Sequence, residues 1–165
     1  MAGPVPRTSA GILLYRRGPD GPEVLLGHMG GPFWARKDDG AWSIPKGEHG
    51  PDEDPLAVAR REFAEELGSP VPGGDLVPLG SAKVTSAKVL TVWAAEGDLD
   101  ATAIRSNTFQ LEWPPRSGRL QEFPEIDGAA WFGLDEARGK LLTGQVPFLD
   151  RLRDDVLGDQ PYPCP

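Results

Sequence analysis

Residues 47–68 combine a run of charged side chains with the apolar spacing of a short helix. Asp54 and Pro55 are typical of a helix start, the first as N-terminal cap and the second in the first turn. Apolar residues recur at helical spacing and fall on one arc, namely Leu56, Ala59, Phe63 and Leu67. The pattern therefore predicts a helix over about residues 55–67 that buries one side in a core.

The other side of this helix carries three carboxylates, Glu62, Glu65 and Glu66. They stand three and four residues apart, so they are neighbours on the helix surface. Like charges at this spacing repel one another unless a cation lies between them. A hard divalent cation with oxygen ligands would fit. A solvated acidic face is the more common interpretation of such a run, so the wider pattern decides between the two.

The whole stretch resembles the signature sequence of the Nudix hydrolases, G-x5-E-x7-R-E-U-x-E-E-x-G. The fixed positions are occupied by Gly47, Glu53, Arg61, Glu62, Glu65, Glu66 and Gly68. Phe63 stands at the bulky apolar position, and Ser69 departs from the usual aliphatic residue. A strand-like run at residues 42–44 precedes the stretch, so strand, loop and helix follow in the order of the family, which favours the metal site.

The resemblance implies hydrolysis of a phosphoric anhydride with Mg²⁺, for which Mn²⁺ can substitute at oxygen-rich sites. The expected metal ligands are Gly47, through its backbone carbonyl, and Glu62, Glu65 and Glu66. Glu62 could instead be the base that orients the water. Arg61 is expected to hold these carboxylates in place, and Glu53 either pairs with it or binds the metal through water.

An acidic residue outside the helix often assists in this family. Glu122 and Glu125 precede a predicted strand at residues 129–132. The sequence slightly favours Glu122 as the assisting residue, and it excludes neither Glu122 nor Glu125.

Basic residues in loops or near strand ends are candidates for contacts with substrate phosphates. The principal set is Arg36, Lys37, Lys46, Lys88 and Arg116, and Lys83 and Arg119 complete the wider set. Trp34, and less strongly Trp42 and Phe109, could stack on a nucleobase, although tryptophans mostly serve the core.

The motif W-x-x-P-K-G around Lys46 resembles the diadenosine polyphosphate and diphosphoinositol branches of the family. Residues 33–42, 106–109, 112–118 and 123–125 resemble a bacterial group described only as predicted NTP pyrophosphohydrolases. The expected substrate is therefore a dinucleoside polyphosphate or a nucleoside triphosphate. The alternative is a non-catalytic domain that senses a phosphorylated metabolite. Isoprenoid diphosphate isomerisation would need a cysteine near the site, and the single cysteine is Cys164.

The composition suits one domain over residues 1–165, with 39% hydrophobic residues and a tail at 158–165 that we expect to be frayed. A net charge of −8 argues against general nucleic-acid binding. No apolar run approaches the ~20 residues of a membrane span, and no signal-peptide layout is present. We therefore expect a cytoplasmic protein with a phosphorylated small-molecule substrate. A homodimer is one option, because members of the family are often dimers, but the sequence shows no interface.

The hydrophobic pattern predicts strands at residues 9–17, 23–28, 41–44, 76–84, 88–95, 102–113 and 129–132. Helices are expected at residues 55–67, 134–142 and 146–157, and residues 114–127 read as a long irregular segment. Together with the Nudix resemblance, this order predicts an α+β fold, an α/β/α sandwich with a mixed sheet between helices.

Overall fold

A seven-stranded mixed sheet forms the centre of the chain in the computed structural model, which describes residues 5–158. Its strands are β1 (Arg7–Gly18), β2 (Gly21–Met29), β3 (Trp42–Ser43), β4 (Lys46–His49), β5 (Leu76–Thr85), β6 (Lys88–Glu96) and β9 (Ile126–Gly133). The order is β3-β2-β1-β6-β5, with β4 paired to β1 and β9 to β2. The tail at 159–165, which we expected to be frayed, lies outside the described residues.

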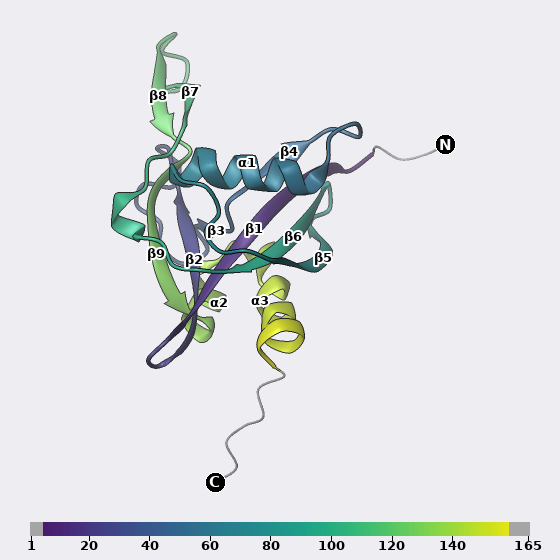
Figure 1. Cartoon of the computed structure of the whole chain (residues 1–165). Coiled ribbons are helices and arrows are strands. Elements are labelled where there is room, and N and C mark those ends of the chain that lie inside the picture. Colours follow the sequence, from purple (N-terminus) through teal and green to yellow (C-terminus); the bar gives the residue numbers. More distant parts are fainter. Residues whose placement is uncertain (1–4, 159–165) are drawn as a thin grey trace.

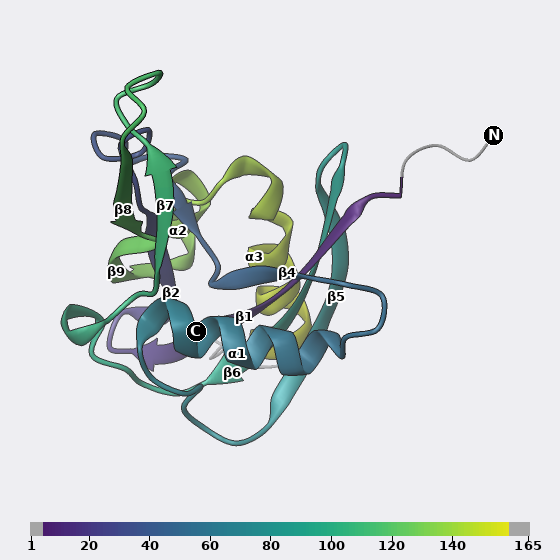
Figure 2. The ribbon, with the colours of Figure 1, turned by 90° about the horizontal axis from the view of Figure 1, so that it is seen from above.

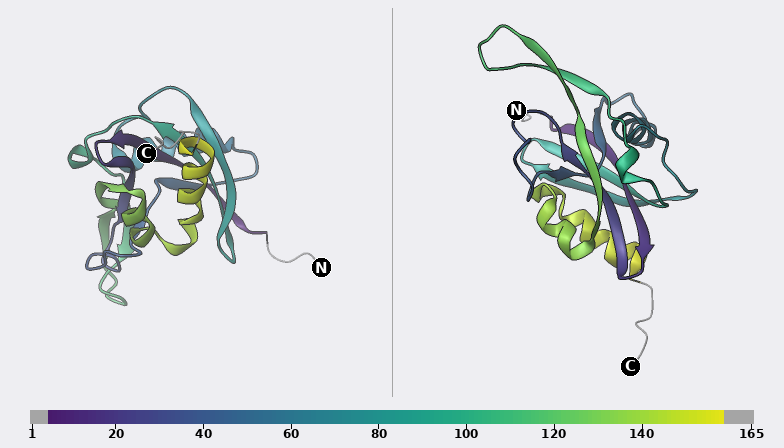
Figure 3. Two further views of the ribbon diagram at one scale, coloured as in Figure 1. Left: turned by 90° about the horizontal axis from the view of Figure 1, so that it is seen from below. Right: turned by 90° about the vertical axis from the view of Figure 1, so that its left-hand side faces the viewer.

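Helices cover both faces of this sheet (Figure 1). Helix α1 (Pro55–Leu67) lies on one face, while α2 (Leu134–Lys140) and α3 (Pro147–Arg151) lie on the other (Figure 3). Helix α3 continues as a π-helical segment, η3 (Leu152–Leu157). The predicted α/β/α sandwich is confirmed. No helix within residues 5–158 has the length and apolar character needed to cross a membrane.

Strand β1 lies at the centre of the core because both of its faces are covered. It runs parallel to β6 and antiparallel to β2 and β4. Successive side chains point to opposite faces, so Ile12 packs in the cluster with Phe63 of α1, and Leu13 packs in the cluster with Phe148 of α3. A strand covered on both faces is hydrophobic at nearly every position, as β1 is in its middle part, residues 10–15.

The segment predicted to be irregular, residues 114–127, is a turn and loop up to residue 119, but it contains strand from Leu120 onward. Strands β7 (Thr108–Glu112) and β8 (Leu120–Pro124) pair as a separate antiparallel ribbon, and β9 begins at Ile126. The ribbon projects from the body beyond one end of α1 (Figures 1 and 2). Two contacts support it: Phe109 lies near Phe123, and the Trp113 ring meets the Phe33 ring edge-on at 5.3 Å.

The base of this ribbon is tied to the C-terminal end of α1. The Arg105 N–H donates to the carbonyl of Leu67 at 3.1 Å, and the Asn107 N–H donates to that of Glu65 at 2.8 Å. Gly68 ends the helix in the left-handed conformation, with φ 80°. These bonds satisfy carbonyls that a helix end leaves without intrahelical partners, and they fix the start of the ribbon against the acidic helix.

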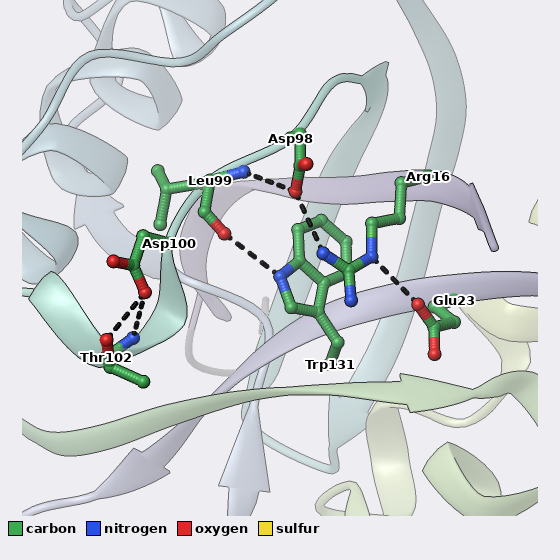
Figure 4. A network of polar contacts seen from close by, with 7 residues as sticks. All are labelled: Arg16, Glu23, Asp98, Leu99, Asp100, Thr102 and Trp131. Atoms are coloured by element: carbon green, nitrogen blue, oxygen red, sulfur yellow. Dashed lines mark hydrogen bonds and ion pairs between the residues drawn. The ribbon is translucent and has the colours of Figure 1, made fainter.

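The connection from β6 to the ribbon is held by a polar network around Arg16 (Figure 4). The guanidinium of Arg16 lies over the Trp131 ring, 4.1 Å from its centroid, and pairs with Glu23 at 2.8 Å and Asp98 at 2.9 Å. The Trp131 Nε1–H donates to the carbonyl of Leu99 at 3.0 Å. One side chain thus joins β1, β2, β9 and the connection.

Replacing Arg16 with Met is expected to lower the free energy of unfolding by about 1 kcal/mol, because cation–π and partly exposed ion-pair contacts are lost together. Urea unfolding measures the change. Arg17→Met is the matched control, since Arg17 is adjacent on β1 and makes only a longer, exposed ion pair, 3.4 Å from Glu96. Equal losses in the two variants would contradict a specific role for the network.

Candidate active site

The three carboxylates of α1 differ in their surroundings. Glu66 is buried, with 8% of its surface exposed, and its Oε2 accepts a hydrogen bond from the backbone N–H of Lys46 at 2.8 Å. Glu62 is half-buried and Glu65 is exposed. The hydrogen bond to Lys46 fixes α1 against β4, a strand that the sequence did not predict.

Burial raises the pKa of Glu66 to about 8, and the negative charges of Glu62 and Glu125 add to this effect. The charge and the N–H of Lys46 act in the opposite direction. Burial also raises the pKa of Glu62, followed by the charges of Glu65 and Glu125, against the lowering effect of Arg61. The site therefore concentrates more negative charge than these two cationic residues offset, and that excess favours a bound cation.

Arg61 lies among three of the predicted carboxylates. Its guanidinium nitrogens are 3.6 Å from Glu53, 3.7 Å from Glu62 and 4.0 Å from Glu65. Contacts of this length at a half-exposed side chain contribute little to stability, so the arrangement suits a residue that orients carboxylates. Glu53 also accepts the Gly50 N–H at 2.8 Å, which is the main reason that its pKa is lowered.

Gly47 lies directly beneath Glu62. A Cβ atom at position 47 would lie 2.1 Å from the Glu62 Cδ atom, far inside contact distance. The sequence analysis proposed the backbone carbonyl of Gly47 as a metal ligand. The structure supplies a second reason for glycine at this position, because a side chain would occupy the space of the Glu62 carboxylate. The space exists because β4 pairs with β1, Gly47 opposite Ala10, directly under the helix.

Gly47→Ala is expected to displace the Glu62 carboxylate and to lower turnover roughly 10–100-fold, the range found when groups that orient metal ligands are disturbed. The fold should survive because the clash is with the far end of a flexible side chain. Steady-state kinetics on the variant tests this. Gly50→Ala serves as control, since its nearest neighbour, Glu53 Oε1, would be 3.7 Å away; equal turnover in both variants would contradict the steric argument.

Of the two glutamates considered outside the helix, the structure brings Glu125 to the carboxylates of α1, where it raises the pKa of both Glu62 and Glu66. Glu122 lies on β8 and accepts a hydrogen bond from the Thr108 hydroxyl at 2.6 Å. Glu125 is therefore the better placed of the two to act with the carboxylates of α1, and a role for either residue remains a prediction.

The position of Glu125 is set by its backbone. Its N–H donates to Asn107 and its carbonyl accepts from Gly30, each at 2.9 Å. Just beyond it, β9 pairs Ile126 with Met29 and Gly128 with His28, which leaves Asp127 as an extra bulged residue. A bulge changes the alternation of side chains along a strand, and no sequence signal marks this one.

A cavity of about 390 Å³ lies beside β4. Because successive strand residues face opposite sides, Gly47 faces Glu62 of α1, whereas Lys46 lines this cavity. The lining comprises Ser9, Met29, Trp34, Lys46, Val84, Thr85, Lys88, Leu90, Leu142, Thr143, Gly144 and Gln145. It unites three predicted substrate-binding residues, Trp34, Lys46 and Lys88. Another cavity, of about 340 Å³ near Asp20 and Arg138, contains no predicted site residue.

The remaining candidates lie elsewhere. Lys37 places its ammonium 5.3 Å from the centre of the Trp34 ring, while Arg36 is exposed on the same loop and does not line the cavity. Arg116 has φ 63° in the turn that closes the β7–β8 ribbon, so the structure does not bring it to the cavity. Lys83 lines a smaller pocket, and Arg119 lies at the start of β8.

The other two aromatic candidates have structural contacts. Trp42 meets the rings of His28 and Phe132 edge-on and donates its Nε1–H to Asp38 at 2.8 Å. Phe109 belongs to the ribbon. Of these three aromatic residues, Trp34 is the one that lines the cavity.

Sequence reasoning missed Gln145, which is 1% exposed. Its Oε1 accepts the Ile44 N–H at 2.8 Å, and its Nε2 donates to the Ser43 hydroxyl at 3.0 Å. It thereby fixes the strand that leads to Lys46 and closes one end of the cavity. A single glutamine in a short loop carries no sequence signal for such a distant contact.

Among residues 5–158, no three Asp, Glu, His or Cys side chains already converge as a metal site. The donor set nevertheless fits a hard cation, because it consists of oxygen atoms only and the burial of Glu62 and Glu66 disfavours their uncompensated charge.

A mixed sheet between helices, with a helix of clustered glutamates following a short strand, defines a protein of the Nudix type. The chain belongs to the NUDIX domain family, whose domain model matches residues 5–152. The predicted family is thereby confirmed, and with it the class of phosphoanhydride hydrolases. The bacterial NTP pyrophosphohydrolase group remains a prediction.

Solved structures share this fold at low sequence identity. An Ap4A hydrolase from C. elegans, in a binary complex, is 20% identical, with 92% of this chain and 98% of that chain covered and a TM-score of 0.59. The NUDIX domain of Shewanella oneidensis NrtR, complexed with ADP ribose, is 15% identical, with coverages of 93% and 90% and a TM-score of 0.64.

A third similar structure is the Nudix hydrolase RenU from M. smegmatis, 21% identical, with coverages of 95% and 89% and a TM-score of 0.57. A search of curated proteins found no match.

Proposed function

We propose that this protein hydrolyses a phosphoric anhydride in a nucleoside diphosphate derivative, with a dinucleoside polyphosphate or a nucleoside triphosphate as the substrate. The observation that carries the proposal is the position of Glu66. It is buried, it is bonded to the backbone of Lys46, and its neighbours Glu62 and Glu125 are acidic. The Lys46 side chain lines the adjoining cavity.

The metal ligands in this proposal are Glu62, Glu65, Glu66 and the carbonyl of Gly47. Mg²⁺, or Mn²⁺ in its place, would supply positive charge to a phosphate oxygen and lower the pKa of a bound water. Arg61 keeps the carboxylates apart and oriented, through its contacts with Glu62 and Glu65. Glu125, rather than Glu122, is the residue outside the helix that assists the water.

The cavity supports a substrate with a flat apolar part and several phosphates. Trp34 offers a ring for stacking, and Lys46 and Lys88 offer point charges to phosphate oxygens. The fold shared with an Ap4A hydrolase and with a domain complexed with ADP ribose agrees with a nucleotide derivative. Cytoplasmic location and a homodimer remain predictions; the elution volume on size exclusion tests the latter.

A hydrolysis screen tests the proposal. Dinucleoside polyphosphates, nucleoside triphosphates, nucleotide sugars, ADP-ribose and diphosphoinositols are incubated with the protein, with and without Mg²⁺. Release of phosphate products from one class, lost without Mg²⁺, is the expected result. Tight binding without turnover would instead favour the sensor, and neither binding nor turnover would contradict both.

A further inference from the structure

Both ring nitrogens of His28, on β2, have oxygen partners. Nδ1 is 2.7 Å from the Oδ1 atom of Asp127, and Nε2 is 2.5 Å from the backbone carbonyl oxygen of Lys37. The side chain is only 12% exposed. His28 therefore connects the bulge of β9 to the loop that follows β2.

The chemistry of these two partners determines the proton count of the ring. A carboxylate oxygen and a peptide carbonyl oxygen can only accept hydrogen bonds, and a neutral imidazole has a single N–H to donate. Only the doubly protonated, cationic ring satisfies both partners at once. Loss of one proton removes one of the two bonds.

The groups around His28 come from four elements. Asp127 of β9 contacts it directly, and the edge of the Trp42 ring on β3 lies 5.1 Å from it between centroids. The loop contributes Lys37 and Asp38, and the ammonium of Lys140 on α2 pairs with Asp38 at 2.6 Å. The charge of Asp38 is thus shared with Lys140 and Trp42, and Asp127 remains the direct counter-ion of the ring.

The carbonyl held by His28 belongs to the turn that carries Trp34. The Lys37 N–H donates to the carbonyl of Trp34 at 2.9 Å, and the Lys37 ammonium lies over the Trp34 ring. Trp34 in turn lines the cavity. A short chain of contacts therefore leads from the His28 ring to the wall of the proposed substrate site.

We propose that His28 is a positioning residue, whose ring holds the Lys37 turn and thereby keeps Trp34 in the wall of the cavity. The effect on substrate rests on the proposed function, whereas the effect on the turn does not.

The first experiment follows hydrogen exchange of the full chain over residues 31–37. His28→Gln should lose protection there relative to wild type, because the imidazole ring no longer holds the carbonyl of Lys37. His49→Gln is the matched control, because the Nδ1 of His49 faces only the carbonyl of its neighbour Gly50. Identical protection in wild type and His28→Gln would overturn the proposal.

A second variant covers the case in which His28→Gln does not fold. Asp127→Asn keeps the shape and an acceptor oxygen but removes the carboxylate that contacts His28, so protection over residues 31–37 should fall. Unchanged protection in this variant would overturn the role of the His28–Asp127 pair.

The second experiment uses the substrate found in the screen. His28→Gln should raise KM about fivefold and leave kcat within about twofold, because a binding wall is disturbed and the carboxylates are not. An unchanged KM with altered exchange would overturn the link to the substrate, while altered exchange without turnover of any compound would count against the proposed function alone.

Discussion

Glu66→Gln is expected to lower turnover by roughly 10³-fold or more, the scale of losing a principal group that stabilises transition-state charge. The amide keeps an oxygen that accepts the Lys46 N–H, so the bond between α1 and β4 survives. The substitution removes the negative charge that would bind a cation next to the phosphoric anhydride of the substrate. Steady-state turnover at saturating Mg²⁺, with circular dichroism to verify the fold, measures the effect.

The matched control for this substitution is Glu48→Gln. Glu48 lies on β4 next to Gly47, but its carboxylate pairs with Arg7 at 3.1 Å on an exposed surface. It should retain wild-type turnover. Near wild-type activity in Glu66→Gln would remove Glu66 from the metal site and would require another centre for the chemistry.

The second large effect concerns the stability of the metal-free protein. In the folded chain the pKa of Glu66 is raised by burial to about 8, from its usual value of 4.5. Between these two values the folded chain holds a proton that the unfolded chain has released, so stability falls as the pH rises through this window. Above pH 8 the full pKa difference lowers the free energy of unfolding by roughly 5 kcal/mol.

Glu66→Gln has no charge to bury, so its stability should lack this decline. Urea unfolding in EDTA between pH 5 and pH 9 tests the expectation, and the variant should exceed wild type at the upper end. Mg²⁺ should then stabilise wild type at pH 8.5 far more than the variant, since a ligand that binds only the folded state raises its stability. Parallel pH profiles for the two proteins in EDTA would show that Glu66 does not carry the buried charge.

The acidic helix could be predicted from sequence to within its observed ends, because its signals are local. Pro55 at the first turn, the apolar arc through Phe63, and Gly68 in the left-handed conformation all act within a few residues. The orientation of Glu125 could not, because it depends on hydrogen bonds to Asn107 and Gly30. A shift of one residue along a strand reverses which side chains face the site.

Strand β7 lies within the strand predicted at residues 102–113, but β8 and its pairing with β7 were missed for a related reason. Strand β8 contains Leu120, Phe123 and Pro124, with little of the β-branched pattern that marks strands. A two-stranded ribbon is marginal on its own, and this one is supported by Phe33 and by the end of α1, both distant in sequence. The cavity depends in the same way on Gln145, which reaches Ile44 across 101 positions.

The base of the ribbon is hydrogen-bonded to the last turn of α1, so it is held next to Glu65 and Glu66. Its closing turn at residues 113–119 lies far from that attachment. Loop tips tolerate changes of length and sequence better than the elements they join. Evolution or design can therefore lengthen, shorten or recharge this turn and alter which large molecules approach the carboxylates, while the spacing of the carboxylates themselves stays constant.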